Sequence, residues 1–326
     1  MRRIALLSAL LLAVAACGSS EDLTTTTGGM PATSVAEATT TTLTVETTTT
    51  ENSAFPVTVS DANGAVVIDA RPERIVSLSS TATEMLFAVG AGDQVVAVDE
   101  YSTYPAQAPI TDLSGFTPNL EAIVGFEPDL VVISFDPGEV ESGLEAVGIP
   151  SLLLTTALSL DDSYAQVEVI GAASGHLAES AAVVLEMQSE IEEIVASAAV
   201  PEGISFYHEV DATLYSASSM SFIGQVYALL GMENIADAAD TDGIGFPQLA
   251  SEYVVNEDPD LIFLADVDFG VTPESLAERP GWDEMTAVQN GAIVELAADL
   301  ASNWGPRVVE LLQTIANAVT ELEPVS

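Results

Sequence analysis

Two carboxylates stand at matching places in a repeated motif. Glu121 is followed seven residues later by Pro128-Asp129, and Glu252 is followed seven residues later by Pro259-Asp260. In each copy an unbroken apolar run comes next, which is typical of a parallel strand covered on both faces. A single Glu near a helix start usually stabilises only the helix dipole, by roughly 0.3–1 kcal/mol. Two in the same context indicate two similar α/β lobes, each presenting a Glu at an equivalent place.

The motifs of covalent catalysis are absent from the sequence. It contains neither GxSxG nor HExxH, and no glycine-rich phosphate loop leads to a lysine. The two histidines, His176 and His208, are too far apart in sequence to indicate a metal site. A lone histidine is more often structural, although His208, at the end of an expected strand, could still meet a metal centre. We therefore predict a non-enzymatic protein without a resident metal or cofactor.

The first residues form a targeting signal. Arg2-Arg3 precede an apolar run over residues 4–13, and small residues around Cys17 form a cleavage site. The run is shorter than the roughly 17–25 residues of a membrane-spanning helix. A cleavage site that ends in the only cysteine resembles a bacterial lipoprotein signal. Residues 1–17 are therefore predicted to be a signal peptide with lipid attachment at Cys17, and an ordinary secretory signal is the alternative.

A threonine-rich segment follows the signal. Residues 18–54 contain several blocks of Thr and little that could form a core, so we predict a disordered tether that holds a domain off the membrane. The sequence leaves open whether this tether is glycosylated.

The charge of the chain is strongly acidic. There is no lysine, and the formal net charge is −44. Nucleic acid and anionic lipid headgroups are excluded as partners, because both require clustered Lys or Arg. A saline habitat and a lineage bias would both account for the acidity.

The remaining sequence predicts two lobes joined by one helix. We expect an N-terminal α/β lobe over residues 55–175, a bridging helix over 176–200 and a C-terminal α/β lobe over 201–326. Strands alternate with helices in both lobes, which indicates a parallel sheet in each. The helical periodicity from about Leu177 to Ala199 would span roughly 35 Å, long enough to bridge two lobes. A final helix is expected from about Pro306 to Leu322.

Aromatic residues are concentrated where ligands of parallel sheets bind. Tyr101 and Tyr104 follow one expected strand and Tyr215 another, while Phe116 and Phe246 shortly precede the two repeated glutamates. Such ligands bind beyond the carboxyl ends of the strands. Any one of these residues could be ordinary core. As a set in both lobes they favour a ligand site, and aromatic walls suit large planar ligands.

A series of motifs resembles one protein family. Residues 72–92 resemble the start of the binding proteins of ABC importers, in particular the group that serves cobalamin, ferric siderophores and haem. The match continues in order through the following segments: Tyr101-Ser102-Thr103-Tyr104-Pro105, Pro118-Asn119-Leu120-Glu121, Phe246-Pro247-Gln248, Arg279-Pro280-Gly281-Trp282 and Gly305-Pro306-Arg307. It covers essentially the whole part after residue 55. The closest likeness is to the vitamin B12-binding members.

The resemblance implies roles for particular residues. It implies two α/β lobes joined by a long helix, with the ligand held in the cleft between them. Glu121 and Glu252 would dock on arginine pockets of the permease. The remaining positions concern the ligand: Tyr101, Phe116, Tyr215 and Phe246 match positions that line the corrinoid site, and Asp299 matches a polar contact there. Phe116 and Phe246 replace a tryptophan of some relatives, which leaves corrinoid specificity open, and Trp304 could compensate.

The scarcity of cations bears on the identity of the ligand. Arg71, Arg74 and Arg279 lie in segments that look structural, so Arg307 is the main cationic candidate, unless it is structural too. Ferric triscatecholates need several cations and haem propionates one or two. A corrinoid or a near-neutral ferric hydroxamate is favoured, and haem stays open.

The sequence therefore predicts an extracytoplasmic, lipid-anchored and monomeric substrate-binding protein of an ABC importer. Two alternatives come from other classes of protein. One is a tetrapyrrole metal chelatase, and the other is a surface adhesion lipoprotein in which the stalk is the functional part.

Overall fold

The computed structural model describes residues 55–138 and 140–322. The signal over residues 1–17, the lipidation of Cys17 and the tether over 18–54 lie outside the described residues. Residues 55–138 and 140–322 belong to one compact unit. Within the described ranges, no helix has the length and apolar character needed to cross a bilayer.

The N-terminal lobe is built on a parallel sheet with the strand order β5-β4-β3-β6-β7. Its strands are β3 (Ile75–Leu78), β4 (Val95–Asp99), β5 (Ile110–Leu113), β6 (Leu130–Ile133) and β7 (Ser151–Leu153). Every residue of β3 and β6 is buried. Alternate side chains of β6 enter two different hydrophobic clusters, Leu130 and Val132 in one and Val131 and Ile133 in the other. Burial on both faces explains why these strands read as unbroken apolar runs.

The other elements of this lobe surround the sheet. They are the helices α1 (Ser80–Ala88), α2 (Leu120–Val124), α3 (Val140–Ala146) and α4 (Leu160–Ser174), and a hairpin of β1 (Val57–Asp61) and β2 (Gly64–Ile68). The side chain of Ser79 caps α1 by accepting a hydrogen bond from the backbone N–H of Ala82. This cap places the first turn of α1 directly after β3, at the carboxyl edge of the sheet.

The C-terminal lobe repeats this arrangement. Its sheet has the order β11-β10-β8-β9 and is also parallel. The strands are β8 (Ser205–Glu209), β9 (Glu233–Asn234), β10 (Leu261–Leu264) and β11 (Ile293–Glu295). The helices are α6 (Phe222–Ala228), α7 (Ser251–Glu257), α8 (Pro273–Ala277), α9 (Thr286–Asn290), α10 (Ala298–Ser302) and α11 (Val308–Glu321). In both lobes the first strand lies between the second strand and the strand of the repeated motif, which confirms the predicted α/β class with two similar parallel-sheet lobes.

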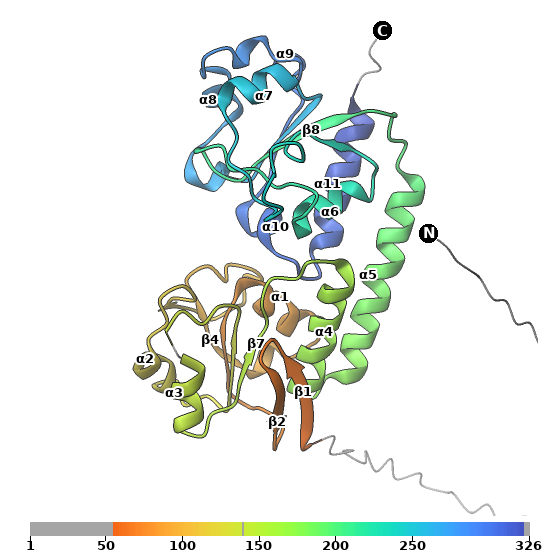
Figure 1. Ribbon diagram of the computed structural model, residues 1–326. Coiled ribbons are helices and arrows are strands. Elements are labelled where there is room, and N and C mark those ends of the chain that lie inside the picture. Colours follow the sequence, from red (N-terminus) through yellow and green to blue (C-terminus); the bar gives the residue numbers. More distant parts are fainter. Residues whose placement is uncertain (1–54, 139, 323–326) are drawn as a thin grey trace, which may run out of the picture. The chain divides into compact units, whose positions relative to one another are not determined.

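A single long helix, α5 (Leu177–Ser197), connects the lobes (Figure 1). Its 21 residues span about 32 Å. It packs against α4 of the N-terminal lobe and α11 of the C-terminal lobe. The buried positions Val184, Met187, Ile191 and Ile194 recur at helical spacing and form the contact face.

The aspartate of each repeated Pro-Asp pair forms hydrogen bonds at the start of the first strand of its sheet. The carboxylate of Asp129 accepts hydrogen bonds from the backbone N–H groups of Glu73 and Arg74, at 2.8 and 2.9 Å. In the other lobe, the carboxylate of Asp260 accepts from the backbone N–H and the hydroxyl of Ser205, both at 2.9 Å. The aspartates of the repeat therefore have a structural role. They hold the helix that carries each glutamate in a fixed position relative to the sheet.

Replacement of Asp260 by alanine should destabilise the C-terminal lobe. It leaves the N–H of Ser205, at a part-buried position, without its side-chain acceptor. We expect a loss of about 1–3 kcal/mol in the free energy of unfolding, measured by urea denaturation. Asp242→Ala, at an exposed position, is the control and should change little. Equal effects of the two substitutions would contradict this account.

Candidate functional site

The predicted aromatic residues of the N-terminal lobe lie at the carboxyl edge of its sheet. Tyr101 follows β4, and its ring contacts Phe116 edge to face with 5.5 Å between the centroids. The two side chains are 51% and 65% exposed, so neither belongs to the core. Gly115 makes this placement possible, because a Cβ there would lie 2.6 Å from the carbonyl oxygen of Leu78. Tyr104 is also exposed.

The aromatic residues of the C-terminal lobe are presented by two loops bound to each other. Tyr215 follows β8 and forms a backbone bridge with Gln248, next to Phe246. The carboxylate of Asp240 accepts hydrogen bonds from the N–H groups of Ile244 and Gly245 and from the hydroxyl of Ser218, which ties the loops together. Tyr215 and Phe246 are 40% and 39% exposed. Each lobe thus offers apolar rings at the edge where ligands of parallel sheets bind.

Three further apolar side chains in these loops were not predicted from the sequence. They are Phe135, Met220 and Ile244, all exposed. Phe135 comes two residues after β6, just as Tyr101 comes two residues after β4, so the rule that selected Tyr101 could have found it. Met220 and Ile244 gave no such signal, because neither comes directly after a strand.

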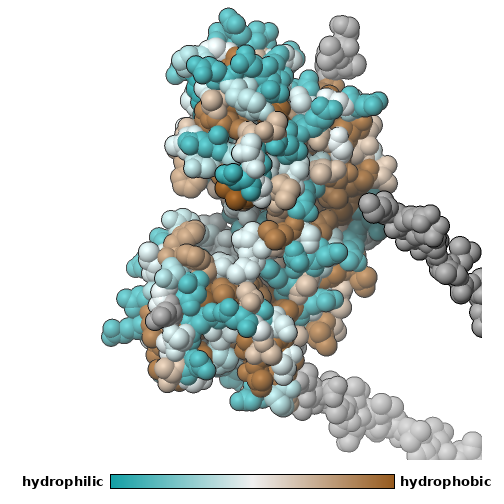
Figure 2. Space-filling model, in the orientation of Figure 1, coloured by the Kyte–Doolittle hydropathy of each residue, from teal (hydrophilic) through white to brown (hydrophobic). Residues whose placement is uncertain are grey.

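The surface is hollowed between the two lobes, and apolar side chains are among those on its margin (Figure 2). A separate hollow of about 810 Å³ lies elsewhere, between the hairpin β1–β2 and α3. Its lining includes Arg71, Asp129 and Pro150, which precede β3, β6 and β7. It therefore lies at the amino ends of the strands, away from the predicted ligand residues.

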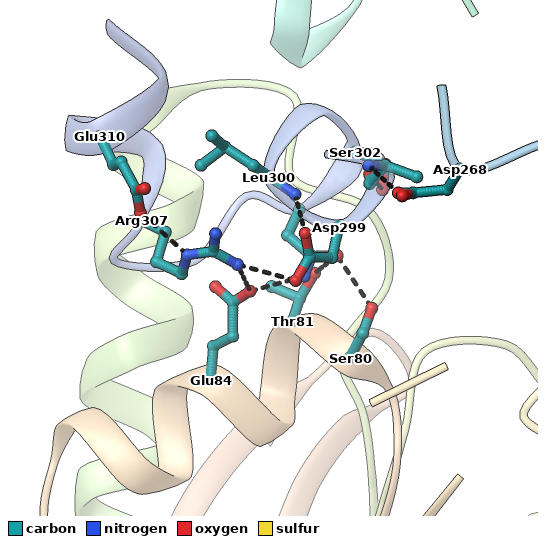
Figure 3. Close-up of polar contacts among 11 residues, drawn as sticks. Ser80, Thr81, Glu84, Asp268, Asp299, Leu300, Ser302, Arg307 and Glu310 are labelled. Atoms are coloured by element: carbon teal, nitrogen blue, oxygen red, sulfur yellow. Dashed lines mark hydrogen bonds and ion pairs between the residues drawn. The ribbon is translucent and has the colours of Figure 1, made fainter. Parts of the chain in front are cut away.

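Asp299, Trp304 and Arg307 lie where α10 and α11 meet the N-terminal lobe. The guanidinium of Arg307 is 2.9 Å from the carboxylate of Asp299, 3.4 Å from that of Glu84 and 3.1 Å from that of Glu310 (Figure 3). It also lies over the ring of Tyr104, 4.1 Å from the centroid. The indole N–H of Trp304 donates to the side chain of Gln166 on α4. Arg307 is therefore already neutralised, which favours the structural role that the sequence left open for it.

The other arginines of the described residues also have partners. Arg71 bonds the carbonyl of Ser174 and the ring of His176, and Arg74 bonds the carbonyls of residues 126 and 127. Arg279 makes a bidentate ion pair with Glu209, with both distances at 2.6 Å. The edge that carries the aromatic rings therefore offers no uncommitted guanidinium among residues 55–138 and 140–322.

Both histidines have partners within the protein. His208 is fully buried within β8, and its Nδ1 lies 2.9 Å from the hydroxyl of Tyr227. Burial lowers the pKa of His208 to about 4, so the ring is neutral near pH 7. The interpretation that His208 could meet a metal centre from the cleft was therefore wrong, because its side chain points into the core. His176 is the residue before α5 and bonds Gln94 and Arg71.

A buried acidic pair lies beneath the carboxyl edge of the C-terminal sheet. Glu209 is fully buried and Asp266 is almost so, and neither oxygen of Asp266 has a hydrogen-bond partner in the described part of the chain. Burial and the neighbouring Glu209 carboxylate raise the pKa of Asp266 to about 6. The described residues contain no group of three or more His, Cys, Asp or Glu side chains that could hold a metal ion.

Glu121 and Glu252 both lie in the first turn of a short helix. Glu121 belongs to α2 and Glu252 to α7, and both side chains are exposed. The residue before the Pro-Asp pair adopts a left-handed backbone in both copies, Glu127 in one and Asp258 in the other. The two carboxylates therefore occupy equivalent positions in the two lobes.

Two parallel-sheet lobes, one connecting helix and apolar rings at the carboxyl edges define a two-lobed binding protein. The chain belongs to the periplasmic binding protein family, whose model matches residues 75–300. This match confirms the resemblance that we inferred from the sequence.

Known relatives are similar over most of the chain. An uncharacterised ABC transporter substrate-binding lipoprotein, YvrC of Bacillus subtilis, is 30% identical, over 82% of this chain and 87% of the relative. A cobalamin-binding protein of Halobacterium salinarum is 32% identical, over 81% of this chain and 74% of the relative. The crystal structure of the periplasmic vitamin B12-binding protein BtuF of Vibrio cholerae superimposes with a TM-score of 0.61 at 24% identity, over 77% of this chain and 99% of that one. This last likeness concerns the fold alone.

Proposed function

We propose that this protein captures a large, near-neutral metal chelate, foremost a corrinoid, and delivers it to the permease of an ABC importer. The observation that carries the proposal is the pair of exposed aromatic groups, Tyr101 with Phe116 and Tyr215 with Phe246, at equivalent edges of the two lobes. Rings offer large contact areas to a planar ligand at little cost in side-chain entropy. The Halobacterium relative, named for cobalamin binding, supports the same ligand.

The arginines already have partners within the protein, and this supports the choice among ligands. A triscatecholate carries several negative charges, and the four arginines of the described residues already pair with carboxylates, carbonyls or a histidine ring. Breaking such a pair leaves a carboxylate or carbonyl without its partner, which costs several kcal/mol when it is buried. A corrinoid or a ferric hydroxamate can bind without breaking any of these arginine pairs.

Haem is the second candidate. The exposed phenols of Tyr101, Tyr104 and Tyr215 favour it, because a tyrosine can act as an axial ligand of haem iron. The buried His208 and the neutralised Arg307 count against it, since they leave the iron without a histidine ligand and the propionates without a free cation.

We further propose how the protein is held and where it docks. Cys17 carries the lipid that anchors it outside the cytoplasm, and residues 18–54 form the tether. Glu121 and Glu252 bind arginines of the permease, for which two exposed carboxylates at equivalent positions of the lobes are well suited. The protein acts as a monomer and by binding without turnover.

Titration calorimetry on the purified protein tests the function. Cyanocobalamin, the ferric hydroxamate ferrichrome and haemin are titrated in turn, and we expect one-to-one binding of cyanocobalamin at micromolar or lower concentration. Metal insertion into a tetrapyrrole by the protein would instead identify a chelatase. Absence of binding to all three compounds would contradict the proposal and favour the adhesion alternative.

A further inference from the structure

The lobes meet at a second, polar junction besides the helix α5. Glu84 belongs to α1 of the N-terminal lobe, whereas Arg307 belongs to the segment that connects α10 with α11 (Figure 3). Asn303 lies in the same segment, directly after α10. The amide of Asn303 donates to Oε1 of Glu84 at 2.8 Å. The hydroxyls of Ser80 and Thr81 donate to the amide oxygen of the same Asn303, at 2.8 and 3.1 Å. Glu84 is thus the carboxylate at the centre of an interlobe contact.

The carboxyl group of Glu84 is enclosed. The residue is 3% exposed, and its Oε2 has no hydrogen-bond partner in the described part of the chain. Gly305 crosses directly over it, because a Cβ at Gly305 would lie 3.0 Å from that oxygen. A side chain at Gly305 would therefore crowd this carboxyl group. An enclosed oxygen without a donor favours the protonated form of the carboxyl group.

The same carboxyl group is connected to the proposed ligand site. Arg307 contacts Glu84 and Asp299 with its Nη1 and lies over the ring of Tyr104. Tyr104 comes from the N-terminal lobe and Asp299 from the C-terminal lobe, so Arg307 orients one candidate ligand residue on each side. Protonation of Glu84 removes one of the charges that hold Arg307 in this place.

The charges around Glu84 leave it near its titration midpoint at neutral pH. Burial raises its pKa, and Asp299 acts in the same direction, while Asn303 and Arg307 lower it, with a result of about 7. The remaining titratable groups on elements packed against α1 or around Arg307 are Asp93, Asp99, Tyr104, Asp161, Asp162, Tyr164, Glu168 and Glu310. Of these, Asp93 and the three acidic residues of α4 are exposed to solvent, and the buried Asp99 accepts a hydrogen bond from Ser102. The balance at Glu84 is therefore set mainly by its enclosure.

We propose that Glu84 is a positioning residue for the ligand cleft, and that capture of the ligand draws a proton from solvent onto its carboxylate. The inference rests on the proposed function, because a ligand that covers Tyr104 and Asp299 excludes further water from the junction. Loss of water disfavours the ionised carboxylate. Binding and proton uptake are then linked, so affinity falls as pH rises through 7.

Calorimetry with cyanocobalamin at pH 7, in two buffers of different ionisation enthalpy, measures the protons taken up. If binding raises the pKa of Glu84 by one unit, wild type takes up about 0.4 proton, and the dissociation constant at pH 8 is about fivefold that at pH 6. Glu84→Gln, which mimics the protonated acid, should take up none and bind equally at both pH values. Glu84→Asp, which keeps a titratable acid, should retain the uptake.

A matched control and a ligand-free measurement complete the test. Glu209→Gln weakens a buried Glu–Arg pair that lies within one lobe, and it should leave the uptake at pH 7 unchanged.

Without ligand, the thermal midpoint of wild type should fall relative to that of Glu84→Gln between about pH 4.5 and 7, since a raised pKa gives stability that is lost as the acid ionises. Binding without proton uptake by wild type, or an uptake that persists in Glu84→Gln, would overturn this inference alone. No binding of cyanocobalamin, ferrichrome or haemin would overturn the proposed function with it.

Discussion

Replacing Glu121 and Glu252 together by alanine is expected to abolish uptake of the ligand by cells while the affinity of the purified protein for the ligand stays unchanged. Both carboxylates are exposed in the first turns of α2 and α7, and neither belongs to the aromatic groups of the proposed ligand site. Removal of one partner of a desolvated charge pair costs about 2–5 kcal/mol, so loss of both should reduce docking by several orders of magnitude. Uptake of radiolabelled cyanocobalamin, together with calorimetry on the purified variant, measures the two quantities separately.

A matched control separates docking from helix stabilisation. Glu179 and Glu274 are also exposed glutamates in first turns, of α5 and α8, so Glu179→Ala with Glu274→Ala removes the same dipole interaction. This control should support normal uptake. A loss of ligand affinity in the Glu121/Glu252 variant, or equal uptake by the two double variants, would refute the docking role.

The second large effect is expected at the ligand. Replacing Tyr101 and Phe116 together by alanine removes the aromatic pair of the N-terminal lobe, whose centroids lie 5.5 Å apart. Burial of two rings against a planar ligand contributes about 2–4 kcal/mol, so the dissociation constant should rise roughly 30- to 700-fold. Because both side chains are exposed in the free protein, the free energy of unfolding should change little. Calorimetric titration and urea denaturation measure the two effects.

Leu185→Ala provides the reference for this substitution. Leu185 is a similarly exposed apolar side chain, but it lies on α5, away from the carboxyl edges of the sheets. Its removal should leave the dissociation constant as it is. If the Tyr101/Phe116 variant bound as tightly as wild type, the ligand would have to lie elsewhere.

Much of the architecture could be predicted because its signals are local. The unbroken apolar runs of β6 and β10 and the prolines before them indicated buried parallel strands, and the helical spacing indicated α5 to within two residues at its end. The repeated glutamates stand in the first turns of α2 and α7, in equivalent places of two similar lobes. Such features depend on residues that are close together in the sequence, so the sequence pattern alone predicts them.

The candidate site could be predicted only in part. Position after a strand selected Tyr101 and Tyr215, and the same rule applied to β6 would have selected Phe135. The same reasoning could not tell that the side chain of His208 points into the core. A strand without alternating polar and apolar residues does not reveal which face of the sheet each side chain lies on. It also could not tell that Arg307 is neutralised by three carboxylates.

The sequence by itself determined the two-lobed class of this protein, its connecting helix and the equivalence of Glu121 and Glu252. Only the tertiary structure decided what Glu84 does, since its partners Asn303 and Arg307 lie 219 and 223 residues further along the chain. The physical reason is that secondary structure follows local patterns of apolar and polar residues, whereas the state of a buried charge depends on what encloses it. For Glu84 that enclosure is supplied by the other lobe, through Gly305 and the segment that follows α10.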